Sequence, residues 1–125
     1  MEFTLTPDIK DYAYGGHPRQ KLDVYFAKSD KKTPVIVYNP VGGFYQDTKD
    51  DILWKMGAII MTAVENGITV VIFNSRFSSD EIFPAPMLDE ARVIQITRYN
   101  SDAWHIDKNL LLATGTSAGG GASLW

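Results

Sequence analysis

Three short apolar runs, each about as long as a β-strand, are spaced along the chain with helix-like segments between them. They are "TPVIVYN" at 33–39, "ITVVIFN" at 68–74 and "NLLLATG" at 109–115. Continuous apolar runs of this length indicate strands that are buried on both faces. Strands that alternate with helices predict a parallel sheet with helices packed against it. The pattern therefore restricts the chain to an α/β fold.

Two helices and an N-terminal hairpin complete the predicted order. "KLDVYFA" alternates as a half-buried strand does, and Gly15-Gly16 supplies a turn before it, so we expect a hairpin over residues 11–26. Apolar residues at helical spacing predict the first helix, which Asn66-Gly67 ends. These residues are Ile52, Leu53, Met56, Ile59, Ile60, Ala63 and Val64. The second helix, within 83–100, begins with prolines and should place Leu88, Ala91 and Ile94 on one apolar side.

The composition excludes several functional classes. With 125 residues the chain is one domain, taken as 1–125, and its net charge of -3 argues against a nucleic-acid partner. The absence of cysteine excludes thiolate metal sites and cysteine nucleophiles. The most apolar region, 54–73, is interrupted by Lys55, Glu65 and Asn66, so we expect no membrane span. No signal peptide is visible at the start, and we expect a soluble protein, with a cytoplasmic location favoured.

The segment "GTSAGG" carries the predicted chemistry. Gly115 and Gly119 flank Ser117 at a spacing of two, directly after a predicted strand and before a predicted helix. A serine on such a sharp turn needs small neighbours, and its hydroxyl lies at the positive end of the following helix. The pattern favours a nucleophile elbow, with Gly115 and Gly119 as the elbow glycines.

Three other interpretations of this turn fit its sequence less well. Ser117 can be an ordinary helix N-cap, but a cap does not need three consecutive glycines in the first turn. A phosphate-binding loop would require a lysine that is missing here. The dinucleotide-binding pattern fails because Ser117 stands where its second glycine belongs.

Five segments in this order extend the pattern over nearly the whole chain: "HPRQKLDVY", "TPVIVYNPVGGFY", "GITVVIFNSRF", "FPAPMLDEAR" and "GTSAGG". From about Tyr14 to the last residue, the sequence resembles the α/β-hydrolase esterases related to hormone-sensitive lipase and to feruloyl esterases. The resemblance implies a truncated α/β-hydrolase fold: an antiparallel hairpin, then parallel strands with flanking helices, ending in the nucleophile helix.

The resemblance also implies a reaction and a site. It implies acyl transfer on a small-molecule carboxylic ester, with Ser117 as the nucleophile and with neither a metal nor another cofactor. The backbone amides of Ala118, Gly42 and Gly43 would form the oxyanion hole. Pro40 and Val41 depart from the His-Gly-Gly-Gly loop of the family, and a plain turn after the strand is the alternative for "NPVGG".

A serine nucleophile also needs a histidine base and a carboxylate. His105 precedes the strand that Ser117 follows, so a seven-residue strand would separate them by roughly 20 Å. His17 lies at the hairpin turn, where a solvated or locally bonded role is favoured. Asp80 and Glu81 are interpreted as solvated loop charges.

We therefore expect the acid and the base to lie beyond Trp125, and the chain to be the N-terminal portion of a hydrolase that is inactive alone. The last strand would then have a bare edge through which the chain self-associates. Arg76 and Asp89 are expected to have structural roles, as a pair or at a helix terminus. The alternative to the enzyme is a non-catalytic α/β-hydrolase-like domain that binds a ligand or a partner.

Overall fold

The computed structural model describes residues 6–40, 53–76 and 85–115, which form five strands and two helices in the predicted order. The N-terminal hairpin consists of β1 (Ile9–Ala13) and β2 (Lys21–Tyr25). The strands that follow are β3 (Thr33–Asn39), β4 (Thr69–Phe73) and β5 (Ile106–Gly115). Helix α1 (Leu53–Glu65) connects β3 to β4, and helix α2 (Ala85–Tyr99) connects β4 to β5.

The described strands form one mixed sheet in the order β1-β2-β4-β3-β5. The strands β3, β4 and β5 are parallel, with Val37 opposite both Val71 and Ala113. The hairpin is antiparallel and adds to this parallel part through β2, which pairs with β4 in antiparallel register. The predicted α/β class, with an antiparallel hairpin followed by parallel strands, is confirmed.

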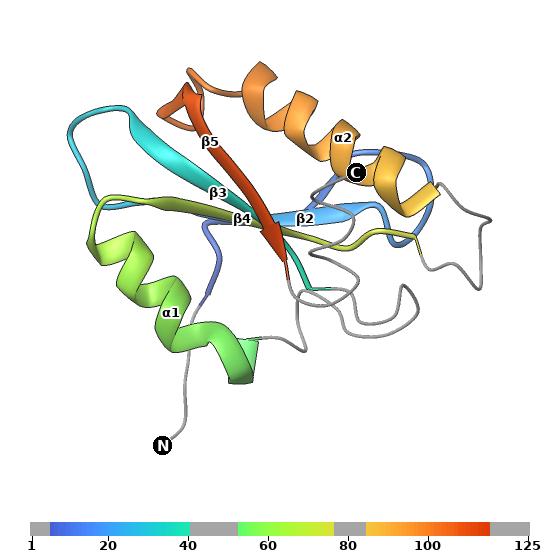
Figure 1. Cartoon of the computed structure of the whole chain (residues 1–125), viewed down its shortest axis with the longest axis horizontal. Helices are drawn as coiled ribbons and strands as arrows, with labels where there is room; N and C mark the ends of the chain where they lie inside the picture. Colours follow the sequence, from blue (N-terminus) through green and yellow to red (C-terminus); the bar gives the residue numbers. More distant parts are fainter. Residues whose placement is uncertain (1–5, 41–52, 77–84, 116–125) are drawn as a thin grey trace.

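The two helices cover opposite faces of the sheet (Figure 1). The chain moves one way across the sheet from β3 to β4, and then back past β3 to β5. Because both crossover connections are expected to be right-handed, this reversal puts α1 on one face and α2 on the other. Strands β3 and β5 become neighbours at this point, where the chain changes direction.

Each face of the sheet has its own apolar cluster. The α2 face is the larger and includes Leu22, Val24, Val35, Val37, Val71, Phe73, Val93, Trp104 and Ile106. The α1 face is built from Tyr25, Tyr38, Ile60, Val70 and Ile72. Strand β4 contributes to both clusters and is buried along its whole length, as its continuous apolar run predicts.

The predicted end of the first helix is confirmed. Helix α1 ends at Glu65, and Gly67 has a φ of 82°, in the left-handed region that favours glycine. The amide of Gly67 donates to the carbonyl of Val64 at 3.3 Å, and the amide of Ile68 donates to that of Ala63 at 2.9 Å. These bonds satisfy carbonyls at the end of the helix and turn the chain into β4.

The predicted apolar side of the second helix is wrong. Leu88 is 52% exposed and Ala91 is also exposed, whereas Val93 is fully buried. Asp89, Glu90 and Thr97 are buried beside Val93, so this helix turns a partly polar face inward. The spacing of apolar residues cannot identify this inward face, because several residues on it are polar. Hydrogen bonds offset part of the cost of burying them.

The prediction that the last strand is buried on both faces is also wrong. Leu110 and Leu112 of β5 are 54% and 59% exposed. Leu111, which points to the opposite face, is partly buried against the α2-face cluster. The strand also begins at Ile106, three residues earlier than predicted, with an irregular register to β3 near its start. Its position at the end of the described sheet explains the exposure.

Candidate active site

The candidate site lies at the edge of the sheet where the parallel strands end. Asn39, the last residue of β3, is opposite Gly115, the last residue of β5. The ends of β3 and β5 are therefore neighbours at this edge of the sheet. In open α/β sheets, ligands bind at this carboxyl edge, next to the point where the chain changes direction.

The structure brings together the starting points of the two predicted site segments. Gly115 belongs to β5, and Pro40 is buried directly after β3. The predicted nucleophile Ser117, its neighbours Ala118 and Gly119, and the predicted donors Gly42 and Gly43 lie outside the described residues. Asp80 and Glu81 lie outside them too.

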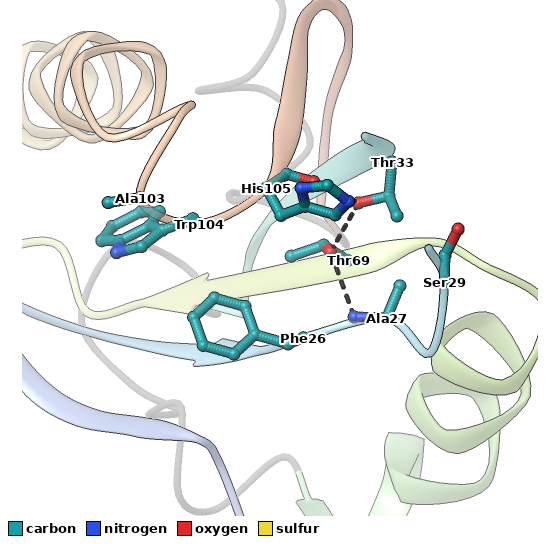
Figure 2. Close-up of a pocket in the computed structure, with 8 residues that line it drawn as sticks. All are labelled: Phe26, Ala27, Ser29, Thr33, Thr69, Ala103, Trp104 and His105. Carbon is teal, nitrogen blue, oxygen red and sulfur yellow. Dashed lines mark hydrogen bonds between the residues drawn. The ribbon is translucent and has the colours of Figure 1, made fainter. Parts of the chain in front are cut away.

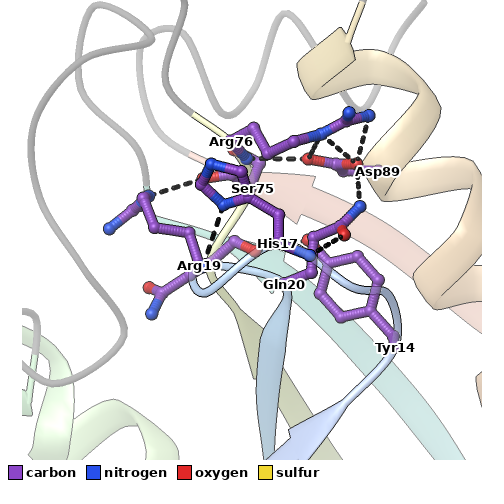
Figure 3. Close-up of polar contacts among 8 residues, drawn as sticks. Tyr14, His17, Arg19, Gln20, Ser75, Arg76 and Asp89 are labelled. Atoms are coloured by element: carbon purple, nitrogen blue, oxygen red, sulfur yellow. Dashed lines mark hydrogen bonds and ion pairs between the residues drawn. The ribbon is translucent and has the colours of Figure 1, made fainter. Parts of the chain in front are cut away.

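Arg76 and Asp89 form an ion pair at the same carboxyl edge (Figure 3). One guanidinium nitrogen of Arg76, Nη2, lies 2.9 Å from Oδ1 of Asp89, and the backbone amide of Arg76 donates to Oδ2 at 2.7 Å. The Asp89 carboxylate is almost completely buried, whereas the Arg76 side chain is 22% exposed. The predicted pairing of these two residues is confirmed.

The hairpin turn is attached to this pair through Gln20 (Figure 3). The side-chain amide of Gln20 donates to Oδ1 of Asp89 at 2.9 Å, and its carbonyl oxygen accepts from the backbone amide of His17 at 2.8 Å. Gly15 leaves room for this arrangement, because a Cβ there would lie 2.2 Å from Gln20 Oε1. No role was predicted for Gln20, although it lies in the segment "HPRQKLDVY" that carries part of the family resemblance.

Tyr14 adds a second link between the hairpin and β4. Its ring packs edge-on against Phe73, with centroids 6.2 Å apart, and its hydroxyl donates to the backbone carbonyl of Asn74. Burial, and to a lesser extent the negative charge of Asp89, raises the pKa of the Tyr14 phenol above its usual value. The phenol is therefore a protonated hydrogen-bond donor and has no capacity to act as a base near neutral pH.

The two histidines are in structural positions. The Nδ1 of His17 accepts the backbone amide of Arg19 at 3.0 Å, which agrees with the predicted local role. His17 is at the carboxyl edge, but β2 is three strands away from β5, a lateral distance of roughly 14 Å.

His105 is at the other end of β5. Its carbonyl accepts the amide of Thr33 at 3.0 Å, and the residue that follows it, Ile106, pairs with Thr33. The six residue steps of β3 between Thr33 and Asn39 correspond to about 20 Å, so His105 is far from Gly115. Neither histidine is adjacent to Gly115, the last residue of β5.

A cavity of about 220 Å³ lies at the opposite, amino edge of the parallel strands (Figure 2). Two of its lining residues, Thr33 and Thr69, are joined by a hydrogen bond of 2.8 Å between their hydroxyls. Thr69 Oγ1 also accepts a hydrogen bond of 3.1 Å from the backbone amide of Ala27. Its other lining residues are Phe26, Ser29, Ala103, Trp104 and His105. These two hydroxyls join the starts of β3 and β4 to each other and to the chain that follows β2.

Among residues 6–40, 53–76 and 85–115, no cluster of three histidine, aspartate or glutamate side chains could hold a metal ion. In the same described ranges, neither helix has the length and apolar character needed to cross a bilayer.

The fold resembles that of several solved esterases. An acetyl ester-xyloside bifunctional hydrolase from Caldicellulosiruptor lactoaceticus is 32% identical, with a TM-score of 0.66 over 82% of this chain and 36% of that one. Esterase LipW from Mycobacterium marinum is 23% identical, with a TM-score of 0.74 over 90% of this chain and 35% of that one. The propionate-bound esterase Est2 from Thermogutta terrifontis is 18% identical, with a TM-score of 0.75 over 90% and 42%. No sequence among the curated proteins matches the chain.

The mixed sheet and the opposed helices are those of an α/β-hydrolase-type domain. Residues 22–124 match the model of the BD-FAE family, an α/β-hydrolase-fold esterase domain, and the chain belongs to this family. It spans less than half of the length of the solved esterases that it resembles.

Proposed function

We propose that the chain is the N-terminal portion of a serine hydrolase that cleaves carboxylic esters, with Ser117 as the nucleophile. Membership of the BD-FAE family supports an ester hydrolase. The observation that carries the assignment to this edge is the pairing of Asn39 with Gly115. Gly42-Gly43 and Ser117 follow these two paired residues closely in the sequence, which supports the proposal that the backbone donors and the nucleophile face one substrate.

The proposed reaction has two acyl-transfer steps. The hydroxyl oxygen of Ser117 attacks the ester carbonyl carbon, and the amides of Gly42, Gly43 and Ala118 stabilise the negative charge that develops on the carbonyl oxygen. A histidine accepts the Ser117 proton during this attack and donates it to the departing alcohol. The same histidine then accepts a proton from the water that releases the acid from the acyl-serine, and it returns a proton to Ser117. We propose that this histidine and its carboxylate partner come from chain beyond Trp125, since His17 and His105 are held elsewhere. The 125-residue chain alone is then expected to lack activity.

Active-site labelling tests this proposal on the polypeptide of natural length that carries this sequence. A fluorophosphonate probe should label the protein, p-nitrophenyl acetate should be hydrolysed, and Ser117→Ala should abolish both. Ser29→Ala is the matched control, because Ser29 lies at the amino edge of the sheet and should leave labelling and turnover unchanged. Labelling that survives Ser117→Ala would contradict the assignment.

The second candidate is a non-catalytic domain that keeps the hydrolase fold and binds a ligand or a partner. The observation in its favour is Pro40, which is buried at the end of β3 and has no backbone N–H to donate to an oxyanion. Under this candidate the natural-length polypeptide would neither react with the probe nor hydrolyse the ester. The sequence of the coding DNA after Trp125 separates the two, since an open frame that supplies an acid and then a histidine favours the enzyme.

A further inference from the structure

The cavity at the amino edge of the parallel strands is large enough for a small organic molecule. Its volume is about 220 Å³, and its lining residues come from the chain after β2, the starts of β3 and β4, and the turn before β5 (Figure 2). For comparison, an apolar cavity of about 150 Å³ in another protein holds one benzene molecule. The space therefore fits a single ring with one or two small substituents.

One wall of this cavity is aromatic. Trp104 is almost completely buried, and its ring packs edge-on against Tyr12, with the ring centroids 5.8 Å apart. Phe26 also lines the cavity and packs against the apolar cluster of the α2 face. Because the core holds both rings, this wall is formed before a ligand arrives.

The imidazole of His105 supplies a polar group without a partner. In the part of the chain that the structure describes, neither of its ring nitrogens makes a hydrogen bond. The backbone of His105 is held in place, since its carbonyl accepts the amide of Thr33 at 3.0 Å and its amide donates to the carbonyl of Asp102 at 3.3 Å. Its φ is 56°, in the left-handed region that is uncommon for residues other than glycine. Backbone strain of this kind is concentrated at functional sites.

The charge of the lining defines the ligand further. None of the eight lining residues is an aspartate, a glutamate, a lysine or an arginine. A charged molecule would lose hydration in this cavity without gaining a counter-charge. The ligand that fits best is therefore uncharged, with an apolar ring and a group that bonds to an imidazole.

We propose that this cavity binds a small uncharged phenol. The ring would lie against Trp104 and Phe26, and the hydroxyl would bond to the imidazole of His105. A neutral imidazole has one nitrogen that donates and one that accepts, so it serves a hydroxyl group in either sense. The cavity is about 20 Å from the carboxyl edge, the length of β3, so the proposal is independent of the chemistry proposed for Ser117.

The residues at the borders of the described ranges do not line this cavity. Thr6 lines a different cavity, together with Met61 and Val64 of α1. Pro40 and Gly115 are at the carboxyl edge, where β3 and β5 end. Strand β5 contributes no lining residue. A further strand beside β5 would extend the sheet on the side away from β2 and β4, whose ends border the cavity.

Fluorine NMR with the probe 4-fluorophenol tests the proposal on the polypeptide of natural length that carries this sequence. The protein should broaden the resonance of the probe. It should bind fluorobenzene, which lacks the hydroxyl, and 4-fluorobenzoate, which is charged, at least ~5-fold more weakly.

Variants of the lining residues locate the binding. His105→Gly removes the imidazole and suits the positive φ, so binding should weaken about 5-fold through the loss of one hydrogen bond. Ala103→Leu fills part of the cavity from an exposed position and should abolish binding. His17→Ala removes an imidazole at the carboxyl edge and is the matched control, which should leave binding unchanged.

A 4-fluorophenol resonance that the protein does not broaden would overturn the proposal. Equal binding by the parent, His105→Gly and Ala103→Leu would place the probe elsewhere and would overturn it too. Equal affinity for fluorobenzene would overturn the role of the imidazole, and equal affinity for 4-fluorobenzoate would overturn the preference for an uncharged ligand. Circular dichroism of each variant verifies that the fold is retained.

Discussion

The carboxylate of Asp89 connects three parts of the chain at the scale of single residues. It accepts hydrogen bonds from the Arg76 backbone and guanidinium, and from the side-chain amide of Gln20. These bonds join the end of β4 to the hairpin turn and to the first turns of α2, at the carboxyl edge of the sheet. A buried carboxylate is stable only when such partners replace its hydration.

Asp89→Asn should therefore destabilise the protein. The Arg76 guanidinium would keep its charge and lose its anionic partner in a largely buried place, which is expected to lower the free energy of unfolding by about 2–4 kcal/mol. Urea unfolding measures the change. Asp102→Asn is the control, because the Lys32–Asp102 pair is solvent-exposed and should contribute nothing measurable. Equal effects of the two substitutions would contradict the structural role of Asp89.

The buried phenol of Tyr14 predicts a loss of stability at alkaline pH. Its pKa is raised in the folded state, so the unfolded chain releases this proton above about pH 10 while the folded chain retains it. The free energy of unfolding should then fall by up to ~1.4 kcal/mol per pH unit above this value from Tyr14 alone. Tyr14→Phe should remove that contribution, whereas Tyr99→Phe, at an exposed side chain, should not. The measurement is urea unfolding of both variants and the parent between neutral and alkaline pH.

Among the elements, the end of α1 shows a direct relation between a sequence signal and a backbone angle. Asn66-Gly67 predicts a helix stop, and Gly67 adopts the positive φ that such a stop requires.

Gly67→Ala is expected to lower the free energy of unfolding by about 1 kcal/mol, because a Cβ is unfavourable at this φ. Gly16→Ala is a matched control: Gly16 has no positive φ, and a Cβ there would meet no atom within 4 Å. Thermal unfolding of both variants decides the question. An unchanged midpoint for Gly67→Ala would show that the cap contributes little.

Most of the element order could be predicted because apolar runs and helical spacing reflect burial directly. The inward face of α2 could not, since Asp89 and Thr97 are polar residues that are buried with hydrogen-bond partners. Similarly, "LLLA" reads as a strand buried on both faces, and only the sheet order reveals that β5 is at an edge. Local sequence does not encode which neighbours a strand will have.

The candidate site was predictable to a similar degree. The structural role of Arg76 and Asp89 was expected from the segments that resemble known esterases. The hydrogen bonds that Gln20 and Tyr14 make could not be predicted, because they depend on how the hairpin turn packs against the end of β4. Ser117, Gly42 and Gly43 stay predictions.

For the molecule as a whole, the two apolar clusters are expected to unfold together because β4 belongs to both. Ile60→Ala on the α1 face should lower the free energy of unfolding by about 2–4 kcal/mol, and Val93→Ala on the α2 face by about 1–3 kcal/mol. Circular dichroism and tryptophan fluorescence should report coincident transitions in both variants. Separate transitions would mean that the faces fold independently.

The sheet order also affects how the protein can fold while it is being synthesised on the ribosome. Strand β3 is synthesised early, yet Val37 finds its two neighbours only about 35 and about 75 residues later. Until β4 and β5 have emerged, the middle of the sheet has no partners, and its valines remain open to chaperones and to misassociation. We therefore expect slow folding, because an early strand is placed between two late ones.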